Sequence, residues 1–298
     1  MRAKFTGVLP PILTLLKNTD EVDVPAMKRH TDRLVRAGCH GIFVAGTTGE
    51  GPNLTLRAWQ EATEAAIEAA AGRVPVYCGA IDLSLARVAE KLQIIGRLGA
   101  HSAVVTPPFY FRHHKADLVE YFRRLADASP VAITAYNIPE MAGCSIPADA
   151  VLELSRIERI TGVKDSSGDW ALMQTMLQQR TRADFEILCG AEPMMGAALL
   201  AGADGIVPGG ANFAPALLIA LYEAGRDGRV AEVFQLQHRL AALREFYHVT
   251  GSPFVSMKIA CKILGISGPA TTFAYAPPTP EQEQQIRQIL EREGVTPV

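Results

Sequence analysis

The chain repeats one pattern along most of its length: a short apolar run rich in Val and Ile, then a longer segment with the period of an amphipathic helix. Such runs are typical of strands buried in a parallel sheet, and the segments between them are long enough for crossover helices. The pattern therefore predicts alternating β/α units. Eight runs are candidate strands: residues 7–15, 41–46, 74–80, 102–106, 131–137, 160–164, 185–190 and 205–208.

Eight parallel strands, each followed by a helix, close into a TIM barrel of roughly 250 residues. The first helix candidates cover residues 25–37, 57–71, 84–98 and 117–128, several of them introduced by Pro, Asp, Ser or Thr. Because the chain has 298 residues, we expect a (β/α)8 barrel over residues 1–225 and a C-terminal helical extension over 226–298, packed on the barrel. An open doubly wound sheet would need a G-x-G-x-x-G turn after the first strand, and the sequence has none there.

The overall charge and the cysteines bound the class of partner and the compartment. A net charge of -2 and a pI near 6.4 give no broad basic surface, so we expect a small-molecule substrate and neither nucleic acid nor membrane. The five cysteines show no C-x-x-C pairing and suggest free thiols in a reducing compartment. Residues 1–7 lack a signal-peptide core, and the expected location is the cytoplasm.

Lys164 is the strongest catalytic candidate, because it ends the apolar run 160–164, where a structural lysine would gain little. The other lysines fall near the start, in a turn or in helical segments, where solvation or snorkelling explains them. An amine at the mouth of an apolar cavity loses hydration, which favours its neutral form and its attack on a carbonyl carbon. This position is what a Schiff-base enzyme requires.

Three further motifs follow candidate strands, at the face where TIM barrels carry their chemistry. Gly46-Thr47-Thr48-Gly49-Glu50 offers hydroxyls and N–H groups for a carboxylate, or it is a plain turn whose Glu50 serves the next helix. Tyr136 can transfer a proton, or it anchors a loop through its hydroxyl. The aromatic residues 109–111 can pack on a substrate or on another subunit. Residues 165–169 are expected to cap the next helix.

No metal or cofactor is expected. His113 and His114 are adjacent, which points their rings apart, and the other histidines form no ligand pair at useful spacing. Gly209-Gly210 follows the eighth candidate strand, where barrels often bind phosphate. Glycines at this point also serve simply to turn the chain.

Taken in order, these motifs resemble the dihydrodipicolinate synthase and N-acetylneuraminate lyase superfamily of class I, pyruvate-dependent aldolases. The likeness covers nearly the whole chain: G-T-T-G-E, T-P-P-F-Y, Y-N-I-P, G-V-K-D and G-A-D-G, then a helical tail. The resemblance implies an imine between Lys164 and pyruvate, with Tyr136 as proton donor and acceptor and Thr48 and Tyr110 in the proton relay. Tyr110 would come from a neighbouring subunit, with Phe109 as a competing alignment, and the family implies a homotetramer, a dimer of dimers.

The resemblance also implies where the substrate binds. The residues expected to contact it are Gly46, Thr47, Thr48, Met141, Glu192 and Ile206. Met141 stands where dihydrodipicolinate synthases usually carry an arginine that holds a carboxylate, and Glu192 is the one acidic residue left where sialic-acid lyases have a pair. These departures make the pattern more similar to aldolases of 2-keto-3-deoxy sugar acids.

The leading hypothesis is therefore a lyase that joins or separates pyruvate and an aldehyde. The alternatives are a 2-keto-3-deoxy acid dehydratase, a dihydrodipicolinate (4-hydroxy-tetrahydrodipicolinate) synthase and an N-acetylneuraminate lyase. A non-enzymatic barrel that only binds a 2-oxo acid is the remaining reading.

Overall fold

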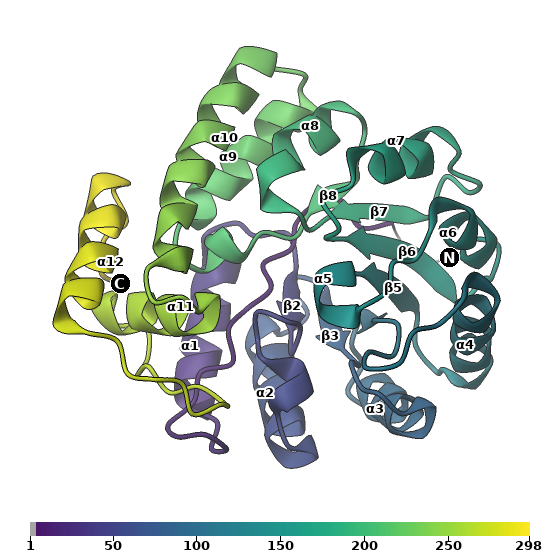
Figure 1. The fold of residues 1–298 in the computed structure, drawn as a ribbon, viewed down its shortest axis with the longest axis horizontal. Helices are drawn as coiled ribbons and strands as arrows, with labels where there is room; N and C mark the ends of the chain where they lie inside the picture. The colour runs from purple at the N-terminus through teal and green to yellow at the C-terminus, as the bar shows by residue number, and fades with distance from the viewer. Residues whose placement is uncertain (1–3) are drawn as a thin grey trace.

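The computed structural model describes residues 4–298 (Figure 1). The N-terminal residues 1–7, which were predicted to lack a signal-peptide core, are described only from residue 4 onward. Eight parallel strands form one sheet in the order β1-β8-β7-β6-β5-β4-β3-β2. Their bounds are β1 Gly7–Val8, β2 Ile42–Val44, β3 Val76–Gly79, β4 Ser102–Val105, β5 Ile133–Asn137, β6 Ile160–Asp165, β7 Glu186–Cys189 and β8 Gly205–Ile206.

The sheet closes into a barrel between β1 and β2, the two strands at the ends of this order. Beyond β1 the extended chain forms a parallel bridge from Pro11 to Phe43 of β2. The Ile12 N–H donates to the Phe43 carbonyl at 2.8 Å, and the Phe43 N–H donates to the Pro10 carbonyl at 2.9 Å. Two prolines without N–H groups explain why the regular strand is shorter than the expected 7–15 run. The predicted TIM barrel is confirmed.

Helices surround the barrel, and two of the predicted ones begin with a side-chain cap, whereas Ser84 at the start of α3 makes none. Asp23 accepts from the Ala26 N–H at 3.0 Å at the start of α1, and Thr55 accepts from the Ala58 N–H at 3.2 Å at the start of α2. The barrel helices are α1 Val24–Arg36, α2 Leu56–Ala70, α3 Leu85–Arg97, α4 Lys115–Ala128, α5 Pro139–Ala142, α6 Ala148–Leu154, α7 Trp170–Gln178, α8 Met195–Leu200 and α9 Pro215–Arg226.

Three α-helices follow α9: α10 Val230–Leu243, α11 Pro253–Ile263 and α12 Pro280–Arg292. α10 packs beside α9, and α12 packs against α11 (Figure 1). The segment that joins α11 to α12 reaches the loop after β2, where Thr272 donates to Glu50. Within the described part of the chain, none of the helices has both the length and the apolar character needed to cross a lipid bilayer.

Alternation along the strands separates two apolar cores. The larger core fills the space between strands and helices, and it contains Val44, Ala135 and Val163. The smaller core lies inside the barrel. Its members are Phe5, Leu9, Phe43, Tyr77, Ile81, Val104, Tyr136, Ile138, Leu188 and Val207.

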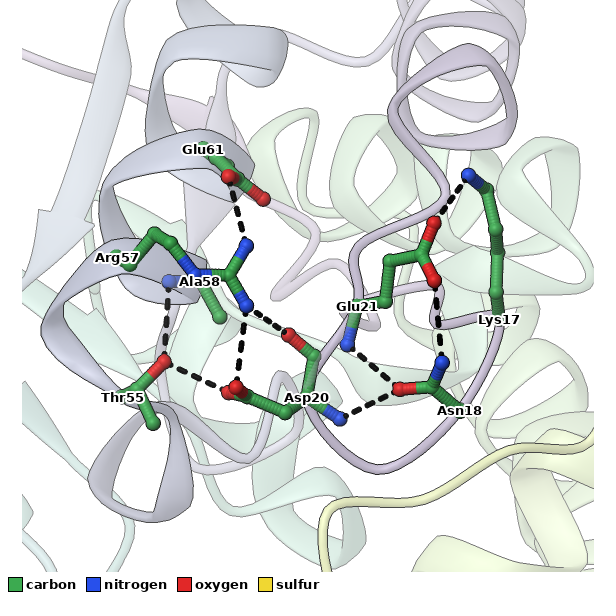
Figure 2. Close-up of polar contacts among 8 residues, drawn as sticks. All are labelled: Lys17, Asn18, Asp20, Glu21, Thr55, Arg57, Ala58 and Glu61. Carbon is green, nitrogen blue, oxygen red and sulfur yellow. Dashed lines mark hydrogen bonds and ion pairs between the residues drawn. The ribbon is translucent and has the colours of Figure 1, made fainter.

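The loop between β1 and α1 is fastened to the start of α2 by exposed polar groups (Figure 2). Arg57 donates to the Asp20 carboxylate at 3.1 Å and to its carbonyl at 2.9 Å, and the Thr55 hydroxyl donates to the same carboxylate at 2.7 Å. Within the loop, Lys17 pairs with Glu21 at 2.6 Å. These contacts hold together the two loops that follow β1 and β2.

Candidate active site

Lys164 lies inside the barrel near the end of β6, in register with Tyr136 of β5 and Leu188 of β7. Its side chain is buried, and Nζ is 3.9 Å from the ring centre of Tyr136 and 4.8 Å from that of Phe43. Over residues 4–298, no carboxylate lies within ion-pairing distance of this amine. Lys164 is thus a buried amine that faces aromatic rings.

Tyr136 is buried beside this amine, and its hydroxyl is 3.4 Å from Thr47 Oγ1. Burial alone would raise the pKa of the phenol. The positive charge of Lys164 and hydrogen bonds with Thr47, Lys164 and Ser166 outweigh that effect and hold the pKa of Tyr136 below its usual value. The lowered pKa suits a phenol that exchanges a proton with a substrate.

The loop that carries Thr47 and Thr48 is a compact turn. The Gly51 N–H donates to the Gly46 carbonyl and the Glu50 N–H to the Thr47 carbonyl, each at 2.9 Å. A Cβ at Gly46 would lie 2.5 Å from the Phe43 ring, so glycine is needed here for packing. Both threonines are half-buried, and the Thr47 hydroxyl is directed to Tyr136.

Glu50 of this loop is fully buried and binds the C-terminal extension. Its carboxylate is 3.1 Å from Lys258 Nζ of α11 and accepts from the Thr272 N–H at 2.8 Å and hydroxyl at 2.7 Å. The interpretation that Glu50 serves the next helix is wrong. So is solvation or snorkelling as the explanation of Lys258, whose side chain is 0% exposed.

Gly190 and Asp165 make contacts around Lys164 that the sequence did not indicate. A Cβ at Gly190 would lie 2.8 Å from Lys164 Cε and 2.1 Å from Ser166 Oγ, so this glycine leaves space for both side chains. Asp165 is buried and accepts from Asn137 Nδ2 at 2.6 Å, and burial raises the pKa of its carboxyl. Of residues 165–169, Asp169 caps α7 by accepting from the Leu172 N–H; Asp165 does not.

Glu192 is held by protein groups. Its carboxylate is 2.8 Å from Arg244 Nε, accepts from the Gly210 N–H at 2.8 Å, and is 3.5 Å from the Tyr247 hydroxyl. Burial raises the pKa of Glu192, although Arg244 and these hydrogen bonds act in the opposite direction. Since this carboxylate occupies the Gly210 N–H, the turn at Gly209-Gly210 gives no support to a phosphate site.

The other predicted contacts lie in different surroundings. Ile206 packs in the outer core, so its side chain faces away from Lys164, whereas the next residue, Val207, points inside. The predicted contact between Ile206 and the substrate stays a prediction, and from this position it would involve the backbone of Ile206. Met141 of α5 is 52% exposed. Tyr110 is 84% exposed with φ at 89°, and its ring packs against Phe111.

A cavity of about 220 Å³ opens beside Thr47 at the carboxyl ends of the strands. Its lining includes Phe109, Met141 and, from the C-terminal extension, Phe254. Larger hollows of about 560 and 1040 Å³ lie around Lys4 and His101, at the amino ends of the strands, away from Lys164. Within residues 4–298, no group of three or more His, Cys, Asp or Glu side chains could hold a metal ion.

Comparison with known proteins agrees with this geometry. The family model of the Dihydrodipicolinate synthetase family matches residues 4–293. The chain belongs to this family. It is an enzyme, a lyase of the class I aldolase type, and the non-enzymatic reading of the sequence is set aside.

Relatives in the dihydrodipicolinate synthetase family carry different activities. A 4-hydroxy-tetrahydrodipicolinate synthase of Methanothrix thermoacetophila is 28% identical over 286 residues, 96% of each chain. A probable 2-dehydro-3-deoxy-D-pentonate aldolase of Escherichia coli K12 is 28% identical over 99% of each chain. A solved structure of a prophage protein of the same family from E. coli K12, in complex with pyruvate, is 27% identical, with a TM-score of 0.91 over 98% of this chain and 99% of that one.

Proposed function

We propose that this chain cleaves and forms the carbon–carbon bond between pyruvate and an aldehyde, as an aldolase of 2-keto-3-deoxy acids such as the sugar acids, through a Schiff base on Lys164. The observation that carries the proposal is the buried Lys164 amine beside the Tyr136 phenol, without a carboxylate partner within residues 4–298. The relative that holds pyruvate supports the choice of 2-oxo acid.

In the cleavage direction, Lys164 Nζ adds to the C2 carbonyl of the substrate and water leaves, which gives an iminium ion. Tyr136 takes the proton of the C4 hydroxyl as the C3–C4 bond breaks, and the bonding electrons move into the iminium to give an enamine. The aldehyde leaves, C3 is protonated, and water hydrolyses the imine to release pyruvate. Water lost in the first step is regained in the last, and no net oxidation occurs.

Thr47 and Thr48 are proposed to bind the carboxylate of the 2-oxo acid. Their loop offers hydroxyls and N–H groups between glycines, which allow an anion to approach the backbone. Thr47 already contacts Tyr136, so the carboxylate site and the proton-transfer group share one side chain.

Tyr110 is proposed to complete the proton relay of a neighbouring subunit in a homotetramer built as a dimer of dimers. Its exposed ring, held beside Phe111, supports a contact with a second copy. We also propose a cytoplasmic location, since five free cysteines suit a reducing compartment.

A second candidate is 4-hydroxy-tetrahydrodipicolinate synthesis, the activity named for several relatives. Met141 argues against it, because a thioether cannot replace the guanidinium that would bind the carboxylate of the aldehyde substrate. Dehydration of a 2-keto-3-deoxy acid would use the same imine. Product analysis separates the two lyase activities, because cleavage alone releases pyruvate and an aldehyde.

The test is reduction with borohydride in the presence of pyruvate, followed by peptide mass spectrometry. We expect a pyruvate-derived mass on Lys164 in the wild-type protein and none at that position in Lys164→Met. Full turnover by a protein in which Lys164 stays unmodified would contradict the mechanism. Lys258, which is also buried, is the internal control for nonspecific modification.

A further inference from the structure

The cavity beside Thr47 is lined mainly by hydrocarbon. Its lining includes Thr47, whose hydroxyl is 3.4 Å from that of Tyr136, so the cavity adjoins the place where proton transfer to the substrate is proposed. The apolar side chains that line it are Pro52, Ile81, Phe109, Ile138, Met141, Ala142 and Phe254. A substituent that is attached to C4 of the substrate and extends into this cavity would therefore contact mostly apolar surface.

Most polar groups of the lining already have partners. The Glu50 carboxylate is bound by Lys258 and Thr272. Asn53 lies at the exposed rim, and its amide nitrogen donates to the Thr272 hydroxyl at 3.2 Å. Thr106 differs from both: it is 4% exposed, and its Oγ1 makes no hydrogen bond to residues 4–298. The wall therefore offers one unpartnered, buried hydroxyl.

The lining also contains no cationic side chain. Within residues 4–298, neither lysine, arginine nor histidine contributes to it, and its one anion, Glu50, is neutralised by Lys258. A carboxylate or phosphate placed here would lose its hydration without gaining an opposite charge, which is strongly unfavourable. A sugar chain with several hydroxyls would leave most of them unbonded, at a smaller cost for each group.

We propose that this cavity is the aldehyde subsite, and that it selects an uncharged aldehyde with a mainly hydrocarbon substituent and at most one hydroxyl, placed against Thr106. The inference rests on the proposed aldolase function and narrows its substrate. The volume of about 220 Å³ is below the ~300–1,000 Å³ of typical ligand pockets, so a short substituent fits. Among 2-keto-3-deoxy acids, those with few hydroxyls beyond C4 are favoured.

Phe254 gives the C-terminal extension a part in this selection. It lies in the first turn of α11 and is half-buried, four residues before Lys258, which is bound to Glu50. The buried ion pair therefore fixes the helix that presents the aromatic ring to the cavity.

The experiment compares pairs of aldehydes in which every polar group of one member is replaced by an apolar group of similar shape in the other, in condensation with pyruvate catalysed by the wild-type full chain. The pairs are propanal and glycolaldehyde, 2-methylbutanal and glyceraldehyde, and 4-methylpentanal and succinate semialdehyde, with kcat/KM measured by product mass spectrometry. We expect the apolar member to be preferred by about 10- to 100-fold in the second pair, by more in the third, and by less in the first, because Thr106 can bond a single hydroxyl.

Two variants locate the selection. Thr106→Val should lower kcat/KM for glycolaldehyde more than for propanal. Phe254→Ala should reduce the preference for 2-methylbutanal over glyceraldehyde, whereas Phe234→Ala, which removes an exposed ring of α10, should leave that preference unchanged. If Phe254→Ala fails to fold, Phe254→Leu keeps the apolar contact and Phe254→Tyr adds a polar group at the same place.

The outcomes separate this inference from the proposed function. A pyruvate adduct on Lys164 together with a preference for glyceraldehyde or succinate semialdehyde would overturn the inference and leave the aldolase proposal intact. No adduct and no turnover with any aldehyde would overturn both. An adduct together with the expected order within all three pairs supports both.

Discussion

Within residues 4–298 three lysines are buried, Lys91, Lys164 and Lys258, so solvation does not explain Lys91 either: its amine donates to the Ile81 carbonyl and pairs with Asp82. Lys258 and Lys164 differ most in what surrounds the amine. Lys258 donates to the carbonyls of Thr14 at 2.5 Å and Ala270 at 2.8 Å and pairs with Glu50. Lys164 faces the ring of Phe43 and the ring and phenol hydroxyl of Tyr136. The amine of Lys258 is surrounded by two carbonyls and a carboxylate, which suits a structural role, whereas the amine of Lys164 has no carboxylate partner within residues 4–298 and faces the proposed site. Burial alone therefore does not identify a catalytic lysine.

The largest effect that tests this comparison is the loss of activity in Lys164→Met. We expect kcat to fall by at least about a thousandfold, because no other group supplies the imine nitrogen. Methionine fits the apolar surroundings, so the melting temperature should not fall. A steady-state assay and a thermal melt on the same preparation check both statements, and unfolding of the variant would show that Lys164 is structural after all.

Lys258→Met should have the opposite profile. Removal of the amine leaves the Glu50 carboxylate buried without a counter-charge, which should lower the free energy of unfolding by about 3–5 kcal/mol. The loop with Thr47 and Thr48 would loosen, so KM for pyruvate should rise while borohydride still labels Lys164. Urea unfolding measures the loss of stability.

The control for Lys258→Met is the double variant Glu50→Gln/Lys258→Met. A neutral amide can still accept from Thr272, so part of the lost stability should return. Equal free energies of unfolding for the wild type and Lys258→Met would contradict the structural role of Lys258.

A smaller effect concerns the pKa of Tyr136. If the charge of Lys164 lowers it, removal of that charge in Lys164→Met should leave burial dominant and raise the pKa of the phenol above its usual value. Ultraviolet difference titration should then show ionisation of one tyrosine moved to higher pH. Tyr136→Phe/Lys164→Met identifies the signal, and an unchanged titration curve would mean that the two groups are not coupled.

The smallest effect is expected from the exposed pair in Figure 2. Arg57→Ala removes contacts to Asp20 that are open to solvent, and exposed pairs contribute little because water and salt screen them. The melting temperature and KM for pyruvate should stay nearly unchanged, also at low salt. A loss as large as that of Lys258→Met would show that the exposed contacts, and not Glu50, hold the loops after β1 and β2.

The fold was predictable because strands and helices leave separate periods in the sequence. Seven of the eight candidate strands contain the observed strand, and the candidate at residues 160–164 ends one residue before the end of β6, since buried parallel strands are short apolar runs. The first strand was overestimated because Pro10 and Pro11 are apolar but cannot donate hydrogen bonds. Lys164 could be singled out because it places a charge at the end of an apolar run, and that run is also what predicted the strand.

What the sequence did not reveal depends on contacts between distant segments. The helical period around Lys258 says that the residue lies on a helix, but not that Glu50 and the carbonyls of Thr14 and Ala270 converge on its amine. The two-residue strand β8 carries too little alternation to show from the sequence that the Ile206 side chain faces outward and that of Val207 inward. Phe254 reaches the cavity from α11, and no local pattern marks such a contact.

The position of Phe254 implies that the barrel and the C-terminal extension contribute differently to the enzyme. The groups proposed to make and break bonds stand on barrel strands and their loops, while one wall of the cavity comes from a helix added after the barrel is complete. Recombination or drift in the last quarter of the chain could thus change which aldehyde is accepted without touching the imine chemistry. For an engineer, exchange of residues 253–263 between family members is a route to new products from the same catalyst.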